Sequence, residues 1–364
     1  MKILVVGTGG SIVSGISTAS DQMARTLVDY GIEVERLNAG VRMRRRSNAL
    51  NLENVWAVVA DALAVYRRAR RGHADLVWIH TFGVPTLPAL RALAMAGAAR
   101  ASGRPALVHF HAFGLERSLD EGGRTLRLVL RALMAVVSAT VVLYGGAADA
   151  LRRVSGRSEI HVLNNWVDVA SELASPPQPP PLRLVFVGGL VRRKGVPLLL
   201  DAMRALDDVP VELRLVGGAG EDGPEALERL HEAAGDLVAA GRVTFAGEPD
   251  AVGVRTEIRA AHLLVLPSEA EGTPISMLEA MAEGRPVLVS DAGNMRSVVE
   301  DTESGWVLPD RRPETIAASV RRIAGDPAGL AAASEQAWRA AGDRYSAAAR
   351  RPQIEAILAS LPTR

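Results

Sequence analysis

Two glutamates set eight residues apart, Glu271 and Glu279, have the residue type and spacing for binding chemistry at a single site. They lie in the segment LPSEAEGTPISMLEAMAEGRPVLVSDAGN, residues 266–294, at a predicted change from loop to helix. Glu271 falls in the loop, and Glu279 falls one to two turns inside the helix. Ionised carboxylates accept hydrogen bonds from hydroxyl groups, so the pair suits two separate sets of sugar hydroxyls.

The residues between these glutamates predict an anion site. Thr273 and Pro274 suit the start of a helix, with Pro274 near its first position. The free backbone amides of Ile275 and Ser276 would then point at whatever lies before the helix, where the helix dipole favours an anion. Phosphates at the helix tip, with sugar hydroxyls on one glutamate and ribose hydroxyls on the other, would make a site for a sugar nucleotide.

Lysine is almost absent from this chain. The only lysines are Lys2 and Lys194, whereas arginine occurs 40 times. Lys194 stands in FVGGLVRRKGV, residues 186–196, between glycines and arginines. A compact ammonium on a flexible stem fits between phosphate oxygens, where a planar guanidinium fits less well. The exception therefore indicates a required chemistry at this position.

A glycine-rich stretch, GTGGSIVSG at residues 7–15, follows the first predicted strand. A dinucleotide-binding fingerprint needs glycine at position 12, where this chain has Ile12. Gly10 and Gly15 still allow the backbone to approach a ligand closely. The stretch is therefore either a ligand-binding loop or only a tight turn.

The elements that must position these residues follow one rhythm in both halves of the chain. Short β-branched runs alternate with helical segments such as 21–30 and 197–206, which is typical of doubly wound parallel sheets. We therefore expect an α/β chain with two Rossmann-like domains across a cleft, and ligands at the carboxyl ends of the strands. The expected strands are residues 2–7, 33–38, 75–80, 106–111, 139–144 and 159–164, and then 182–189, 211–218, 242–247, 262–268 and 286–291.

A proline-rich stretch, SELASPPQPPPLRL, separates the two halves. Proline favours an extended, semi-rigid connector, so we predict an interdomain linker at residues 170–182. The first domain would be residues 1–169 and the second residues 183–340. The tail is helical in pattern from residue 335 to residue 361.

Charge is unequal between the halves. Residues 1–170 hold 21 Lys and Arg against 13 Asp and Glu, a net charge of +8, and residues 171–364 carry −7. The arginine runs at 42–47 and 67–71 are either solvated surface or a basic face toward anionic lipid or a charged acceptor. No aromatic residues alternate with these arginines to stack on bases, so we expect no nucleic-acid partner.

Cysteine and long apolar segments are both absent. Zero cysteines excludes disulfides and thiolate chemistry. The longest apolar stretch, residues 132–143, is too short for a bilayer, which takes about 20 residues, and the apolar start of the chain is too short for a signal peptide. We therefore expect a cytoplasmic protein, with peripheral membrane contact as the alternative to purely solvated arginines.

Several segments together resemble the GT-B retaining glycosyltransferases of family 4. The pattern EGTP…LEAMA.G.PV with its two glutamates is similar to that family's donor-site signature. Four further segments, in the family's order, resemble its opening strand and loop, its active-site strand, the approach to its linker and its phosphate clamp. They are MKILVVGTGG (1–10), PALVHFHAFG (105–114), VLNNWVD (162–168) and FVGGLVRRKGVPLLLDAM (186–203).

The resemblance implies roles for residues at matched positions. His111 would lie beside the transferred sugar, and Lys194 would pair with the phosphates. Glu271 would bind the sugar hydroxyls, and Glu279 would bind the ribose. The final helix, residues 341–364, would pack back onto the first domain. The further donor-binding candidates are Gly10, Gly15, Arg192, Arg193, Gly272, Thr273, Pro274, Ile275 and Ser276.

The resemblance also implies a reaction. A hexose-type sugar would move from a nucleotide-diphosphate sugar to a glycan, a glycolipid or another hydroxyl acceptor, with no metal, no cofactor and no enzyme nucleophile. Electrostatic support for the departing diphosphate would then be the main catalytic demand. Two other histidines lie near His111 in the predicted sheet. We expect His109 to point away from His111 and to be structural, and His80 to be a weaker candidate than His111 for a functional histidine.

One departure from the family pattern keeps other functions open. The family usually has an arginine where this chain has Gly189, so either Arg192 or Arg193 reaches in, or Lys194 carries the charge alone. A non-catalytic sugar-nucleotide-binding subunit and a sugar-nucleotide epimerase are the alternative functions. An NAD-linked oxidoreductase is a more distant one, because the glycine fingerprint fails.

Overall fold

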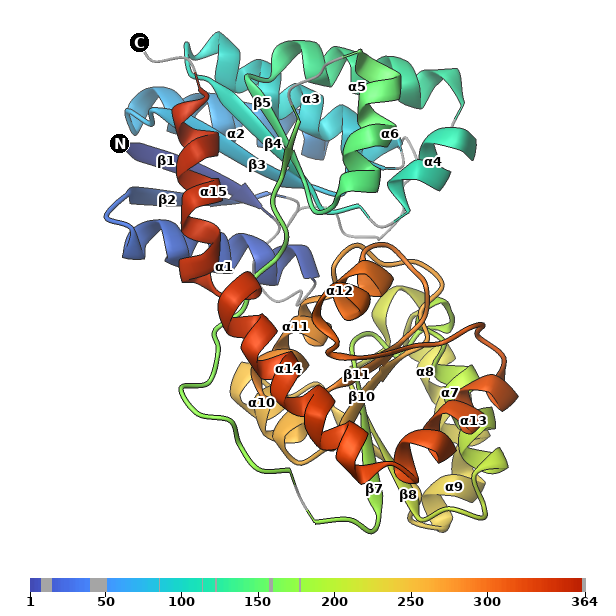
Figure 1. Cartoon of the computed structure of the whole chain (residues 1–364). Coiled ribbons are helices and arrows are strands. Elements are labelled where there is room, and N and C mark those ends of the chain that lie inside the picture. The colour runs from blue at the N-terminus through green and yellow to red at the C-terminus, as the bar shows by residue number, and fades with distance from the viewer. Residues whose placement is uncertain are drawn as a thin grey trace. The chain divides into compact units, whose positions relative to one another are not determined.

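The chain forms two compact units, each built on one parallel sheet. The first unit is residues 1–165 with residues 350–364, and the second is residues 166–349. Helices cover both faces of each sheet, as Figure 1 shows. The computed structural model describes residues 1–7, 15–39, 51–84, 86–112, 114–121, 123–156, 160–176 and 178–361.

The sheet of the first unit contains all six strands that the sequence predicted for this half. Its order is β2-β1-β3-β4-β5-β6, and every pairing is parallel. The order reverses between β1 and β3, which is the switch point where doubly wound sheets bind ligands. The strands are β1 (Lys2–Gly7), β2 (Glu33–Asn38), β3 (Leu76–Thr81), β4 (Ala106–Phe110), β5 (Ala139–Val142) and β6 (His161–Val162).

Seven helices of the described chain pack on this first sheet or complete its unit. The alanine-rich inner surfaces of α2 and α3 and the leucine-rich inner surface of α5 share a core with the sheet. Helix α1 contacts β1, β2 and β3. The last helix belongs mainly to this unit, where Arg351 stacks on the ring of Tyr30, 4.7 Å from its centroid. The helices are α1 (Gly15–Asp29), α2 (Leu52–Arg71), α3 (Thr86–Ala101), α4 (Leu115–Glu121), α5 (Arg124–Val136), α6 (Gly145–Ser155) and α15 (Ala347–Ala359).

The sheet of the second unit has one strand more than the sequence predicted. Its order is β12-β11-β10-β7-β8-β9, again entirely parallel, with the switch point between β7 and β10. The extra strand, β12, contains only three residues and begins at a glycine, so it gives no periodic signal. The strands are β7 (Leu182–Val187), β8 (Val211–Val216), β9 (Val243–Gly247), β10 (Leu263–Leu266), β11 (Val287–Val289) and β12 (Gly305–Val307).

The helices of the second unit cover both faces of its sheet and enclose a large apolar core. The tail predicted as helical is two helices, since α14 ends at Tyr345 and α15 begins at Ala347. Among the described residues, no helix is long and apolar enough to cross a membrane. The helices are η1 (Arg192–Lys194), α7 (Val196–Ala205), η2 (Gly220–Asp222), α8 (Pro224–Ala233), α9 (Gly235–Ala239), α10 (Ala251–Arg259), α11 (Ile275–Ala282), α12 (Met295–Thr302), α13 (Pro313–Ala324) and α14 (Pro327–Tyr345).

Candidate functional site

The second unit brings Lys194 and Glu271 together, although they are 77 residues apart in the sequence. The ammonium Nζ of Lys194 lies 3.2 Å from Oε1 of Glu271, and both side chains are largely buried. Ser268, which is fully buried, donates a hydrogen bond of 2.9 Å to the same carboxylate oxygen. Lys194 follows β7 and Glu271 follows β10, so the pair lies at the switch point of the sheet.

Glycines allow this close approach of two loops. A Cβ on Gly188 would lie 3.0 Å from Nζ of Lys194, and its φ of 146° disfavours any other residue. Gly195 has a φ of 78°, and a Cβ there would clash with the carbonyl of Pro267, at 2.4 Å. The sequence between β7 and α7 therefore folds so that the lysine faces the loop that follows β10.

The two arginines before Lys194 have different surroundings. Nη1 of Arg193 donates to the carbonyl of Ala270 at 2.7 Å, and lies 4.0 Å from Oε1 of Glu271. Its Nε donates to Glu221 at 2.9 Å. Arg192 is exposed, and its side chain forms no hydrogen bond or ion pair with a described residue. Of the two arginines that the sequence left open, Arg193 is thus the one at the site.

The loop from Glu271 to the start of α11 is buried and fixed by its backbone. The carbonyl of Gly272 accepts a hydrogen bond of 2.9 Å from the amide of Asn294. A Cβ on Gly293, whose φ is 58°, would lie 2.0 Å from the carbonyl of Glu271. Sequence reasoning missed Gly293 and Ser268, both of which stand inside the donor-site segment and hold Glu271 in place.

Helix α11 begins at Ile275, so the predicted helix start is confirmed within one residue. Pro274 is its N-cap, with φ −61° and ψ 129°, and no side chain caps the first turn. Thr273 and Ser276 are buried beside this turn. Burial raises the pKa of Glu279, Arg255 opposes that rise, and Glu283 adds to it. Glu279 is half-buried on α11.

Three histidines cluster in the first unit, at the carboxyl ends of β3 and β4. Nδ1 of His80 and Nε2 of His111 lie 2.8 Å apart and share a hydrogen bond. The ring of His109 lies 4.2 Å from that of His111, centroid to centroid. The expectation that His109 points away from His111 is therefore wrong, because residues two apart on a strand share one face.

Burial keeps these histidines neutral. It lowers the pKa of His111 to about 3, and lowers the pKa of His80 and His109 well below the usual value. At neutral pH none of the three is a cation, so the cluster offers neutral hydrogen-bonding imidazoles rather than positive charge. His80 lies next to the switch point of its sheet, with its Cβ 3.9 Å from the Cβ position of Gly7.

Neutral imidazoles are also metal ligands, and nitrogens of these three rings lie within 4.8 Å of one another. The arrangement fits a metal poorly. The bond between His80 and His111 occupies one nitrogen of each ring. Metal-bound histidines usually donate their second N–H to an acceptor, and neither nitrogen of His109 forms a hydrogen bond of good geometry with a described residue. The contacts therefore describe a hydrogen-bonded, stacked cluster.

Of the glycine-rich stretch at residues 7–15, the structure describes Gly7 and Gly15. Gly15 is exposed and begins α1, with open space around its Cβ position. Gly10 lies outside the described residues, as do the other loop residues 8–14 and the arginine run at 42–47. His111 belongs to the first unit, whereas Lys194, Glu271 and Glu279 belong to the second.

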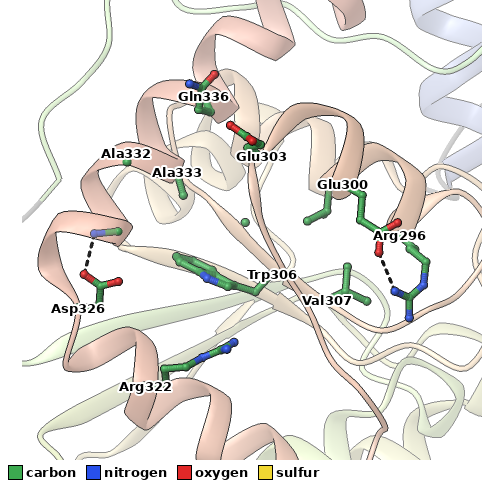
Figure 2. Close-up of a pocket in the computed structure, with 13 residues that line it drawn as sticks. Arg296, Glu300, Glu303, Trp306, Val307, Arg322, Asp326, Ala332, Ala333 and Gln336 are labelled. Carbon is green, nitrogen blue, oxygen red and sulfur yellow. Dashed lines mark hydrogen bonds and ion pairs between the residues drawn. The ribbon is translucent and has the colours of Figure 1, made fainter.

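A pocket of about 570 Å³ lies elsewhere in the second unit, between α12, β12, α13 and α14. Trp306 stands at its centre, with Arg322, Glu303 and Gln336 around it (Figure 2). None of the predicted site residues lines this pocket. It is therefore separate from the cluster of Lys194 and Glu271.

The fold defined by these two sheets is that of two-domain GT-B glycosyltransferases. The chain superposes on sucrose-phosphate synthase from Thermosynechococcus elongatus with a TM-score of 0.78, at 18% identity and over 99% of both chains. It superposes on Anabaena HepE, solved in complex with UDP-glucose, with a TM-score of 0.72, at 19% identity, covering 99% of this chain and 100% of the other. Both matches confirm the predicted fold.

The sequence also matches two family models, one in each half. Residues 13–171 match "Glycosyltransferase Family 4", and residues 181–326 match "Glycosyl transferases group 1". The chain therefore belongs to the family 4 glycosyltransferases, as its motifs indicated.

Curated relatives match over part of their length. A D-inositol 3-phosphate glycosyltransferase of Streptomyces bingchenggensis is 30% identical over 190 residues, which is 49% of this chain and 42% of the relative. The alpha-D-kanosaminyltransferase of Streptomyces kanamyceticus is 30% identical over 175 residues, 48% of this chain and 44% of the relative. The matched part thus spans less than half of these relatives.

Proposed function

We propose that this chain is a retaining, metal-independent glycosyltransferase that moves a hexose-type sugar from a nucleotide-sugar donor to a hydroxyl acceptor. The buried pair of Lys194 and Glu271, beside the amino end of α11, is the observation that carries the proposal. A cation, a carboxylate and free helix amides at one switch point match the phosphates and hydroxyls of such a donor. HepE, which has the same fold, was solved with UDP-glucose.

Donor binding would exchange the partners of this pair. The ammonium of Lys194 would form an ion pair with the diphosphate, with Arg193 beside it. The sugar hydroxyls would donate hydrogen bonds to the carboxylate of Glu271. Ser268, hydrogen-bonded to Oε1 of Glu271 at 2.9 Å, would keep that carboxylate oriented during the exchange. After the exchange the ammonium of Lys194 would face the diphosphate. The carboxylate of Glu271 would be hydrogen-bonded to hydroxyl groups, with the guanidinium of Arg193, 4.0 Å from it, as its cation.

The reaction would need no enzyme nucleophile. The bond from the anomeric carbon to the diphosphate oxygen would break, a bond to the acceptor oxygen would form on the same face, and the acceptor proton would pass to the diphosphate. Charge that develops on the diphosphate would be stabilised by Lys194 and the α11 amides. His80, through its 2.8 Å hydrogen bond, would hold the neutral ring of His111 in one tautomer and orientation.

A panel of UDP-, GDP- and ADP-sugars in a thermal-shift assay tests the donor site. One nucleotide class should raise the melting temperature, because a ligand that binds only the folded state stabilises it. No shift with any of them would overturn the donor assignment. A purified chain that binds a donor and transfers nothing to any acceptor would support the non-catalytic subunit, which the missing arginine at Gly189 motivates. Product formed without acceptor would support the epimerase.

A further inference from the structure

Helix α2 of the first unit carries large apolar side chains on its outward face. Leu52 is 83% exposed and Trp56 is 70% exposed, and the other three exposed apolar side chains lie between 43% and 48%. With 3.6 residues per turn, all five fall on one side of the helix over three turns. This apolar stripe consists of Leu52, Val55, Trp56, Val59 and Leu63.

The inward face of the same helix contains polar residues where a surface helix normally has large apolar ones. It buries mostly small or polar residues, and Val65 is the one larger apolar side chain among Asn54, Ala57, Asp61, Val65 and Ala69. Asp61 pairs with Arg91 of α3 at 2.7 Å, in a contact that is nearly buried. A surface helix usually turns its large apolar residues toward the core and its charges toward water. On α2 the face that contains Asp61 packs against the rest of the unit, and the apolar stripe is exposed. The stripe is therefore available to contact another surface.

Arginines continue the stripe toward the carboxyl end of α2. Arg67 lies four residues after Leu63, on the same side of the helix, and Arg71 follows one turn later. Neither forms a hydrogen bond or ion pair with a described residue, whereas Arg68 pairs with Glu35 at 2.8 Å. The exposed acidic residue of α2 is Glu53, at its amino end. The outward face is therefore apolar and then basic.

We propose that α2 docks on an anionic lipid bilayer and lies in the plane of the headgroups. A helix with Trp and Leu on one side and arginines beside them binds this boundary, its apolar side about 5–10 Å deep. Trp56 has the amphipathic ring that favours the interface. Arg67 and Arg71, which pair with none of the described residues, would contact lipid phosphates, in a half-chain whose net charge is +8. A second copy of this chain is the other possible occupant of the stripe, and the experiment below distinguishes it from lipid.

Vesicle co-sedimentation of the full chain tests this surface. Binding to vesicles of phosphatidylcholine with phosphatidylglycerol should exceed binding to phosphatidylcholine alone by at least about tenfold, and should weaken with salt. Trp56→Ser with Leu63→Ser should lower the binding by about tenfold or more. Arg67→Gln and Arg71→Gln should each lower it about fivefold, on anionic vesicles only.

Leu128→Ser is the matched control, because Leu128 is 62% exposed on α5 of the same unit. It should leave vesicle binding unchanged. Since every changed side chain is exposed, the variants should keep the melting temperature of the parent, which confirms that they fold. Equal binding by the stripe variants and the parent would overturn the proposal. So would a dimer in light scattering that the stripe variants abolish, without vesicle binding by the parent.

Discussion

Removing the ammonium of Lys194 should destabilise the protein even before any donor is present. In Lys194→Met the carboxylate of Glu271 would stay buried with the hydroxyl of Ser268 at 2.9 Å and the guanidinium of Arg193 4.0 Å away. Breaking a fully buried ion pair by removing one partner costs about 3–5 kcal/mol. Because these two partners remain and Lys194 is 17% exposed, we expect about 1–3 kcal/mol here.

A double-mutant cycle isolates the pair itself. It combines Lys194→Met, Glu271→Gln and the double variant, and measures each free energy of unfolding in urea at pH 7. The neutral double variant leaves no charge unpaired, so it should be more stable than the sum of the single effects predicts. We expect a coupling energy of about 1–2 kcal/mol.

An exposed pair in the same unit supplies the control cycle. Arg296 and Glu300 are one turn apart on α12, and Nη1 of Arg296 lies 2.7 Å from Oε1 of Glu300. Their side chains are 39% and 57% exposed. Such surface pairs couple by about 0.3–0.5 kcal/mol. A coupling of Lys194 with Glu271 no larger than that of the control pair would refute the reasoning that the two charges meet in a buried, preformed site.

Three further predictions concern other parts of the site. Gly189→Arg should raise donor affinity about tenfold, since a Cβ at this position meets nothing closer than 3.4 Å. Gly188→Arg should lower donor affinity, because its Cβ would lie 3.0 Å from Nζ of Lys194. Calorimetric titration of the two variants with the donor measures both effects. Gly293→Ala should cost more than about 1 kcal/mol of stability, because φ is 58° and its Cβ would meet a carbonyl oxygen; an unchanged urea midpoint would contradict this. Acid should destabilise the first unit, since the pKa of His111 is about 3 when folded and about 6.5 when unfolded. The unfolded state then binds more protons, so stability is full above pH 6.5 and falls toward pH 3 by about 1.4 kcal/mol per pH unit for each such histidine. His109→Leu should flatten the dependence of the urea midpoint on pH between 7 and 5, and an unaltered slope would count against neutral buried imidazoles.

Most of the fold followed from local pattern. Eleven strands were predicted from short β-branched runs that alternate with helical segments, and all eleven are present. The strand that was not predicted, β12, lies at the edge of the sheet. Its three residues are too few to show an alternation of apolar and polar side chains. The helical tail was predicted, but its break at Ser346 was not, since the sequence there has no proline or glycine to end a helix.

The sequence predicted which residue types form the site, but not which of these side chains contact each other. Lys194 and Glu271 could be placed at strand ends, but their direct ion pair depends on the neighbouring position of β7 and β10, which are far apart in the sequence. The choice between Arg192 and Arg193 depends on the turn of η1 and on the carbonyl of Ala270, neither of which local sequence encodes. For His109 the prediction was wrong although the sequence held the information, because residues two apart on a strand share one face and His109 lies beside His111.

Calorimetric titration of the chain with the nucleotide sugar that stabilises it tests the central claim most directly, when the parent and Lys194→Ala are compared. Lys194 is the cation of the proposed phosphate site, and a hydrogen bond to a charged group contributes about 1.5–3 kcal/mol. The account predicts one binding site per chain, with an affinity that falls by about tenfold to a hundredfold in the variant. Equal affinities for the two proteins would contradict it.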